Sequence, residues 1–192
     1  MEGERLAGGN AGGTVRVGQT VRRVAGPWTP AVHALLAHLA AKGFVGSPRP
    51  LGLDECGRDV VSFLPGLTVG DRRPWPAWTH ADGTLDQVAR WLRSYHETVA
   101  DFVPPPGAVW REGGTWRPDS IIGHNDAAPY NAVWTRAGEL VGFIDWDFAG
   151  PVEPDWDLAY AVFSWVPLHA RHVVAAEGFT DFAARPAGWR AS

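Results

Sequence analysis

The sequence predicts an α+β fold in which strands are concentrated in residues 1–66 and helices in residues 67–192. Short apolar segments joined by Gly-containing turns occupy much of the first third, and this pattern is typical of paired strands. Two longer segments in the remainder carry apolar residues at helical spacing. Between these two segments, residues 121–150 place His, Asp and Asn side chains around a predicted β-hairpin. The fold class follows from these three observations.

Composition and charge narrow the class of protein. The 192 residues suffice for one well-buried domain or for two small lobes that share a cleft. The 17 basic and 21 acidic residues give a net charge of −4 without a basic run, so nucleic acid is not an expected partner. We find no apolar segment suited to a signal peptide or a membrane helix, and therefore expect a cytoplasmic protein without a membrane partner. Cys56 is the single cysteine, which fits a reducing compartment, and the oligomeric state is left open.

The N-terminal segment combines a glycine-rich loop with a predicted hairpin. Residues 8–13 contain four glycines and precede two alternating strands, 14–17 and 20–24. The Gly18-Gln19 connection places glycine first, which suits a type II′ turn. Loop glycines let backbone N–H groups approach a ligand closely, but they are equally typical of a flexible tail, and both interpretations stay open.

Residues 27–43 predict a helix, with Thr29 as its N-cap and Gly43 at its C-terminal end. Its apolar residues fall on one stripe, formed by Val32, Leu35, Leu36 and Leu39. The helix contains no acidic residue. We expect its histidines, His33 and His38, to be surface or packing residues.

The same patterns predict the other elements. These are strands at 51–53 and 59–64, an amphipathic helix at 85–102, a buried helix at 157–165 and a weaker helical pattern at 169–184. Asp155 or Asp157 lies near the start of the 157–165 helix, where a carboxylate satisfies free N–H groups. His96 lies on the apolar stripe of the 85–102 helix, so we expect a hydrogen-bonded core histidine there.

A predicted hairpin organises the polar residues of the central stretch. Its strands are 132–134 and 140–144, and Asn131 comes just before the first strand while Asp145 follows the second. Because the two ends of a hairpin are neighbours, an amide oxygen and a carboxylate are brought together. Oxygen ligands of this kind suit Mg²⁺, which is usually held by one or two carboxylates and by substrate phosphates. The pair therefore predicts a cation site.

Two further aspartates face the same region. Asp126 lies five residues before Asn131, in the loop that leads into the hairpin, where its carboxylate could accept the proton of an attacking hydroxyl. Asp147 would share the face of Asp145 if the second strand continued that far. A second metal, a cationic substrate and a solvated turn are all compatible with Asp147.

These residues carry a resemblance to a known family. Residues 124–131, HNDAAPYN, resemble the H-x-D-x-x-x-x-N catalytic loop of protein-kinase-like phosphotransferases, and 144–146, IDW, resemble their metal-binding Asp after a strand. Residues 147–151 and 155–159 resemble the aminoglycoside phosphotransferase family more closely than protein kinases. The resemblance implies a bilobal kinase-like fold, with a nucleotide-binding lobe at 1–66 and a catalytic lobe at 67–192 that ends earlier than is usual in the family.

The resemblance also implies roles. Asp126 would be the catalytic base, Asn131 and Asp145 the Mg²⁺ ligands, and His124 and Asp157 structural supports. Lys42 is the only lysine against sixteen arginines, so Arg23 is the candidate for the phosphate-contacting cation. The nucleotide-binding set is Arg23, Gly9, Gly12 and Leu64, the last at a predicted hinge between the lobes. Asp147 would meet the substrate or a second metal.

Three functions compete at this point. The first is a small-molecule kinase that uses ATP or GTP with Mg²⁺ to phosphorylate a hydroxyl of an aminoglycoside-like or amino-alcohol acceptor. The second is a weak or inactive binding protein of the same fold, of the toxin or antibiotic immunity type. The resemblance implies a glutamate on the 27–43 helix that orients the phosphate-contacting cation, and this helix has no acid. The missing helix acid, the missing lysine and the early C-terminus favour this second function. The third is a metal-dependent hydrolase that would use His124, Asp126 and Asp145, although its ligand set is incomplete.

Overall fold

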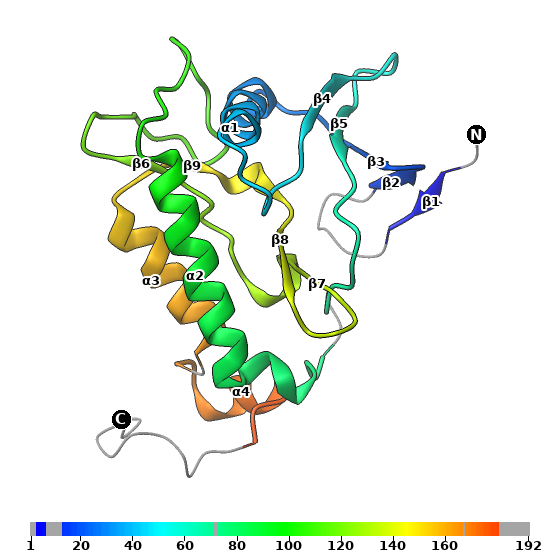
Figure 1. Ribbon diagram of the computed structural model, residues 1–192, viewed down its shortest axis with the longest axis vertical. Coiled ribbons are helices and arrows are strands. Elements are labelled where there is room, and N and C mark those ends of the chain that lie inside the picture. The colour runs from blue at the N-terminus through cyan, green and yellow to red at the C-terminus, as the bar shows by residue number, and fades with distance from the viewer. Residues whose placement is uncertain (1–2, 7–12, 71–72, 167, 181–192) are drawn as a thin grey trace.

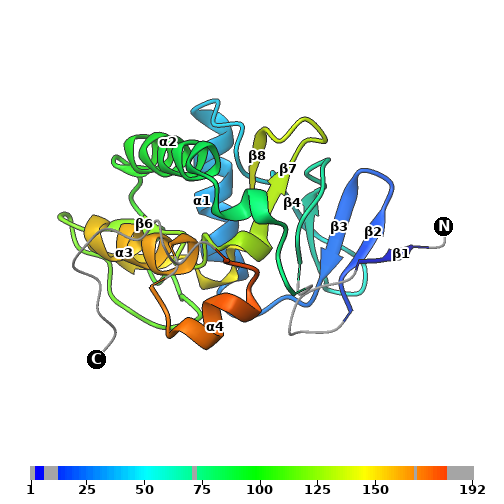
Figure 2. The same ribbon diagram turned by 90° about the horizontal axis from the view of Figure 1, so that it is seen from below.

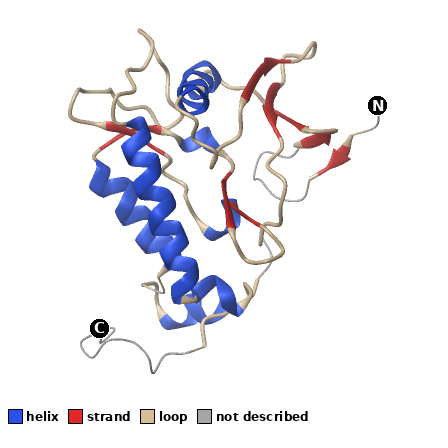
Figure 3. Cartoon of the chain, viewed as in Figure 1, coloured by secondary structure: helices blue, strands red, loops and turns tan. Residues whose placement is uncertain are grey.

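A computed structural model describes residues 3–6, 13–70, 73–166 and 168–180 of the chain. Figure 1 shows an antiparallel sheet on one side of the molecule and two long helices on the other, with a β-hairpin between them. Figure 3 shows the same separation by secondary structure, and it agrees with the α+β class predicted from the sequence. The glycine-rich residues 7–12, which include Gly9 and Gly12, lie outside the described residues.

The N-terminal sheet has five antiparallel strands in the order β1-β2-β3-β5-β4. The strands are β1 (Glu4–Arg5), β2 (Val15–Val17), β3 (Thr20–Arg23), β4 (Pro50–Leu53) and β5 (Asp59–Ser62). Four of them were predicted to within a few residues. Strand β1 was missed, because two residues carry no readable alternation.

Helix α1 (Thr29–Ala41) connects β3 to β4 and buries the apolar stripe that was predicted. The predicted N-cap was wrong by one residue: the helix begins at Thr29, and Trp28 precedes it without a capping side chain. The Thr29 hydroxyl instead accepts a hydrogen bond from the backbone N–H of Gly26, at 2.9 Å. Thr29 therefore fixes the turn that leads into the helix.

Two helices form the other side of the molecule. Helix α2 (Asp82–Val99), preceded by the 3-10 turn Ala77–His80, packs against α3 (Pro154–Trp165), and the short α4 (Arg171–Ala176) follows (Figures 1 and 2). Helix α3 was predicted to be buried, and this was wrong. It buries only Asp157, Ala161 and Trp165, whereas its other apolar side chains are exposed, namely Trp156, Leu158, Val162 and Phe163. The prediction took the apolar residues of this helix as evidence that all of its faces are buried, whereas only one face is.

The central stretch is held by two strand pairs. The predicted hairpin is present as β7 (Ala132–Trp134) and β8 (Leu140–Phe143). A second pair, β6 (Ile121–Gly123) with β9 (Gly150–Val152), was not predicted. This pair joins the two ends of the 124–149 segment. All the polar residues singled out in the central stretch therefore lie inside one closed loop.

The core beneath this loop is aromatic. Trp91 of α2 packs against Phe143 of β8 with ring centroids 4.5 Å apart, and Tyr95 meets Trp146 at 5.2 Å. The Tyr95 hydroxyl donates to the backbone oxygen of Ile122 in β6. Helix α2 is thus fixed to both strand pairs, and the loop between them rests on a rigid base.

The chain crosses from the sheet to the hairpin just after residue 66. The backbone groups of Leu67 and Trp134 exchange two hydrogen bonds of 2.8 Å. A side chain at Gly66 would meet the backbone oxygen of Trp134 at 2.7 Å, so this approach requires glycine. The predicted lobe boundary falls on this crossing and stays a prediction. Within the described residues, no helix combines the length and the apolar character needed to cross a membrane.

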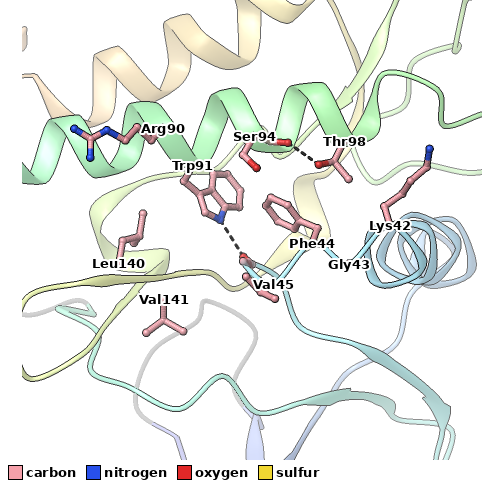
Figure 4. Close-up of a pocket in the computed structure, with 11 residues that line it drawn as sticks. Lys42, Gly43, Phe44, Val45, Arg90, Trp91, Ser94, Thr98, Leu140 and Val141 are labelled. Atoms are coloured by element: carbon pink, nitrogen blue, oxygen red, sulfur yellow. Dashed lines mark hydrogen bonds between the residues drawn. The ribbon is translucent and has the colours of Figure 1, made fainter.

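Strand β8 approaches the loop after α1 so closely that only glycine fits. A Cβ at Gly142 would lie 2.2 Å from the backbone oxygen of Gly46, which accepts hydrogen bonds from the backbone N–H of Phe143 and from the Trp91 indole. The dashed line at Trp91 in Figure 4 marks the second of these bonds. Gly138, in the hairpin turn, also has a positive φ, of 82°, but a Cβ there meets nothing within 4 Å. At both positions the backbone φ is unfavourable for a residue with a side chain, but only at Gly142 would that side chain collide with neighbouring atoms.

We expect Gly142→Ala to destabilise the protein more than Gly138→Ala. A side chain at Gly138 carries a strain of about 1–2 kcal/mol for a left-handed backbone, and one at Gly142, whose φ is 154°, carries a strain of about 1–3 kcal/mol. Gly142→Ala adds an overpacking cost of about 1–3 kcal/mol. Urea unfolding of the two variants measures the difference. Equal losses would show that β8 is not pressed against the 46 loop.

Candidate active site

Arg23, at the end of β3, joins the sheet to the central loop. Its Nε donates to Asp59 Oδ2 at 2.8 Å, across the β3·β5 register in which the two residues face each other. Its Nη1 lies 3.2 Å from Asp145 Oδ1 and 2.9 Å from Asp147 Oδ1. One largely buried guanidinium therefore contacts carboxylates from two distant parts of the chain.

Helix α1 contributes to this network through a histidine. His33 Nε2 lies 2.5 Å from Asp59 Oδ1, so the second carboxylate oxygen of Asp59 is also used. The expectation that His33 is a surface or packing residue was wrong. The acid that the helix lacks is supplied by the neighbouring strand, and the helix supports that acid with an imidazole. His38 instead packs against Phe102 and contacts Asp101.

The pKa values of the carboxylates in this network shift in opposite directions. Burial alone lowers the pKa of Arg23, but its three carboxylate partners outweigh that effect and raise it. Burial raises the pKa of Asp59, but hydrogen bonds from His33 and Arg23 hold the pKa below its ordinary value. For Asp145, burial and the charges of Asp147 and Asp126 raise the pKa despite Arg23. Arg23 therefore does not fully compensate the buried charge of Asp145.

Asn131 and Asp145 are neighbours, as the hairpin predicted. The backbone N–H of Ile144 donates to the backbone oxygen of Asn131 at 3.0 Å, and Asp145 follows directly with a left-handed φ of 61°. The Asn131 amide nitrogen donates to Asp126, to its Oδ2 at 2.7 Å and to its backbone oxygen at 3.0 Å. The amide oxygen is then the atom left for a cation. Among the described residues, no group of three or more His, Cys, Asp or Glu side chains forms a metal site by itself.

Asp126 is buried and fully engaged. Besides Asn131, its Oδ1 accepts hydrogen bonds from the hydroxyls of Tyr130 at 2.6 Å and Tyr160 at 2.7 Å. Burial and the nearby Asp126 carboxylate raise the pKa of both tyrosines, so both hydroxyls keep their protons. The expected proton acceptor therefore already holds two hydroxyl donors of the chain.

The loop around Asp126 is braced from below. His124 is fully buried against Trp146, with ring centroids 4.4 Å apart, and its Nδ1 accepts the backbone N–H of Asp126 at 3.3 Å. Burial lowers the pKa of His124, which favours its neutral form. Asp157 accepts the backbone N–H of Asn125 at 2.8 Å and contacts His96 Nε2 at 2.8 Å. Through these contacts, His124 and Asp157 hold the backbone of the loop in place.

Asp147 reaches the site by a different route from the one expected. The strand ends at Phe143, and Trp146–Phe148 form a 3-10 turn, so Asp147 does not share a strand face with Asp145. The turn nevertheless directs the Asp147 carboxylate to Arg23. The predicted nucleotide residue Leu64 lies half-buried just after β5, two residues before the crossing at Gly66.

Several residues of the site were missed in the sequence. Arg111 lies over the Phe148 ring at 4.5 Å, and its Nη1 lies 3.5 Å from Asp147 Oδ2. Asp59 was readable in principle, because the strand register places it opposite Arg23. His33, Tyr160 and Arg111 lie in segments whose periodicity says nothing about this contact.

A surface pocket of about 410 Å³ lies elsewhere, between the loop after α1 and helix α2. Figure 4 shows Lys42, Phe44, Trp91 and Thr98 around it. Neither Asp126 nor Asp145 lines this pocket. Its Trp91 indole donates to the Gly46 backbone oxygen at 3.2 Å, so two of the lining residues make the structural contact described above. The candidate chemistry therefore belongs to the Arg23 and Asp126 region.

Comparison with known proteins finds a family resemblance over part of the chain. Residues 108–191 match the sequence model of the phosphotransferase enzyme family. The Trifolitoxin immunity protein of Rhizobium leguminosarum bv. trifolii is 38% identical over 161 residues, which cover 81% of this chain and 59% of that protein. The chain thus spans about three fifths of the length of this relative.

Solved structures show the same fold. The GDP and kanamycin complex of APH(2")-IIia superposes with a TM-score of 0.55 at 18% identity, covering 95% of this chain and 79% of that one. The aminoglycoside phosphotransferase APH(3'')-Id from Streptomyces rimosus, in complex with ADP and streptomycin, gives 0.51 at 14% identity, covering 92% and 83%. The family resemblance predicted from the sequence and the protein-kinase-like fold are both confirmed.

The Arg23, Asp59 and His33 contacts generate a stability prediction. Asp59→Asn should lower the free energy of unfolding at neutral pH by about 1.5–3 kcal/mol, the usual contribution of a hydrogen bond to a charged group. Because the pKa of Asp59 is lowered, its contribution is present above the ordinary aspartate pKa and is lost as the pH falls through the folded value. Urea unfolding across acidic and neutral pH measures this.

Asp101→Asn is the matched control, since Asp101 pairs with Lys42 at an exposed site. It should change stability less than Asp59→Asn. A variant of Asp59 that is as stable as wild type at neutral pH would contradict a structural role for the network.

Proposed function

We propose that the protein is a small-molecule kinase that transfers the γ-phosphoryl group of ATP or GTP to a hydroxyl of an aminoglycoside-like or amino-alcohol acceptor. One observation carries the proposal: Arg23 of the sheet contacts Asp145 and Asp147, beside the loop of Asp126 and Asn131. Phosphoryl transfer depends mainly on positioning and charge neutralisation, and this arrangement supplies both. The family match supports the same reaction class.

The charge balance fits a divalent cation. Arg23 contacts three carboxylates, and Arg111 approaches only one of them. The excess negative charge and the raised pKa of Asp145 favour a cation beside that residue. Asn131 and Asp145 would hold Mg²⁺ through oxygen atoms, and the bound ion would neutralise charge on the nucleotide phosphates. This donor set matches the preference of Mg²⁺ and leaves room for water and phosphate ligands.

Arg23 would then contact the nucleotide phosphates. Its Nε is held by Asp59, so Nη1 remains directed at the loop when Asp145 turns to a cation. Backbone groups near Leu64 would meet the base, with residues 1–66 as the nucleotide-binding lobe. Gly9 and Gly12 are proposed to close over the phosphates. The GDP and ADP complexes among the structural relatives support a nucleotide donor.

Asp126 would accept the proton of the acceptor hydroxyl, in the catalytic lobe at 67–192. The buried contacts of His124 and Asp157 would keep its backbone fixed, as positioning requires. Asp147 and the exposed Glu153 and Asp155 would give a cationic acceptor an attractive surface. The kanamycin and streptomycin complexes of the structural relatives support an aminoglycoside-like acceptor.

A second candidate is a binding protein of the immunity type with little or no turnover. The 38% identity to the Trifolitoxin immunity protein favours it. The engagement of Asp126 by Tyr130 and Tyr160 also favours it, because an external hydroxyl must displace one of them.

The melting temperature with ATP and Mg²⁺, separately and together, tests nucleotide binding. We expect a rise of several degrees only when both are present, since a ligand bound to the folded state stabilises it by mass action. Asp126→Asn should keep this rise and lose turnover by about 100-fold or more, the usual contribution of a general base. A wild type that binds nucleotide but turns over with no acceptor would favour the immunity interpretation.

Asp145→Asn should separate stability from function. Because the pKa of Asp145 is raised, its contribution to stability is present below the ordinary pKa and lost as the pH rises through the folded value. The variant should therefore melt at or slightly above the wild-type temperature at neutral pH without ligand. It should lose the rise caused by Mg²⁺ with ATP. A variant that keeps that rise would remove Asp145 from the cation site.

A further inference from the structure

Asp126 already makes the contact that a kinase base makes with its acceptor. A base must lie within about 2.6–3.2 Å of the hydroxyl oxygen whose proton it takes. The Tyr130 hydroxyl lies 2.6 Å from Asp126 Oδ1, and the Tyr160 hydroxyl lies 2.7 Å from the same oxygen. The chain therefore places its own hydroxyls where the proposed function requires the hydroxyl of an acceptor.

The hydrogen atoms of this cluster leave one tyrosine oxygen available. The two tyrosine oxygens are 3.2 Å apart. Three close contacts, one from each tyrosine to Asp126 and one between the tyrosines, therefore share only two hydroxyl hydrogens. Asp126 Oδ2 is occupied by Asn131, so Oδ1 is the oxygen that accepts from the tyrosines. When both hydroxyls donate to Oδ1, neither donates to the other. The lone pairs of Tyr130 Oη are then free of hydrogen-bond donors within the pair.

We infer that Tyr130 is a self-phosphorylation site, and this inference rests on the proposed kinase function. The Tyr130 oxygen attacks the γ-phosphorus of bound ATP, and a new O–P bond forms. The bond between that phosphorus and the β,γ-bridging oxygen breaks, and ADP leaves with that electron pair. The hydroxyl proton passes to Asp126, and solvent later removes it. The products are phosphotyrosine, ADP and a proton, so no further reactant is required.

Tyr130 is the better placed of the two tyrosines. It belongs to the 3-10 turn Pro129–Asn131 and directly precedes the proposed cation ligand Asn131. Tyr160 lies on α3, three residues after Asp157, which braces the loop. Tyr160 is therefore a positioning residue that keeps Asp126 oriented. The remaining tyrosine of the chain, Tyr95, is fully buried in the core and donates to Ile122.

Proximity makes this acceptor effective. A hydroxyl held by its own loop needs no binding step, and such intramolecular reactants gain large effective concentrations. The modification would proceed in the absence of any small-molecule acceptor. It would also place a phosphate beside Asp126, where it excludes an external hydroxyl. The same site would thereby limit its own turnover.

The test incubates the purified full chain with ATP and Mg²⁺ and follows phosphorylation by intact mass and peptide sequencing. We expect one phosphoryl group per chain, located on Tyr130, with a rate constant that does not change with protein concentration. Tyr130→Phe should abolish the modification, and Asp126→Asn should slow it by about 100-fold or more. Tyr160→Phe should still be modified on Tyr130, at a changed rate.

The melting-temperature measurement separates the two possible failures. If ATP with Mg²⁺ raises the melting temperature but Tyr130 stays unmodified, the self-phosphorylation is wrong and the nucleotide site stands. If the same rise is absent, both are wrong. Modification on another residue, persistence in Tyr130→Phe, or a rate that increases with protein concentration would each overturn a reaction within one chain at Tyr130.

Discussion

The structure depends on the contacts of one guanidinium, that of Arg23. Arg23 and Asp145 are 122 positions apart in the chain, and their 3.2 Å contact joins the sheet to the central loop. A buried cation is costly without partners, and Arg23 draws its partners from both sides, Asp59 from the sheet and Asp145 with Asp147 from the loop. The β6·β9 and β7·β8 pairs flank the segment that contains Asp145 and Asp147 and hold it near Arg23.

The choice of arginine explains the unusual layout. A guanidinium has donors on separate nitrogens in a fixed fork, whereas an ammonium is a single point of charge. Arg23 uses Nε for Asp59 and Nη1 for Asp145 and Asp147, so the orienting acid can lie beside it on the next strand. An acid on helix α1 is then unnecessary, and His33 occupies the helix side of Asp59. The missing lysine and the missing helix acid thus have one explanation, the contact between Arg23 and Asp59 on neighbouring strands.

The spacing of residues along the chain predicted the elements that depend on local sequence alone. The stripe of α1, the period of α2 and the hairpin around Asn131 and Asp145 follow from spacing along the chain, and all three were found. The β6·β9 pair has three residues on each strand and no period to detect. His33, Tyr160 and Arg111 reach the site only through tertiary packing. Asp147 shows both cases: it was expected to face the same region as Asp145 through a continued strand, but the strand ends at Phe143, and its contact with Arg23 was not anticipated.

The polar groups of the site satisfy one another. Arg23 forms ion pairs with Asp145 and Asp147. Asp126 accepts hydrogen bonds from Tyr130, Tyr160 and Asn131. Each hydrogen bond to a charged group contributes about 1.5–3 kcal/mol, so a ligand must replace these contacts with others of equal strength. A divalent cation with a polyphosphate can do so for Arg23 and Asp145, because it offers each group an opposite charge. A neutral hydroxyl offers Asp126 only what the tyrosines already give. Under the proposed function, nucleotide binding would therefore be the favourable exchange at this site, and turnover would depend on the access of an external acceptor to Asp126.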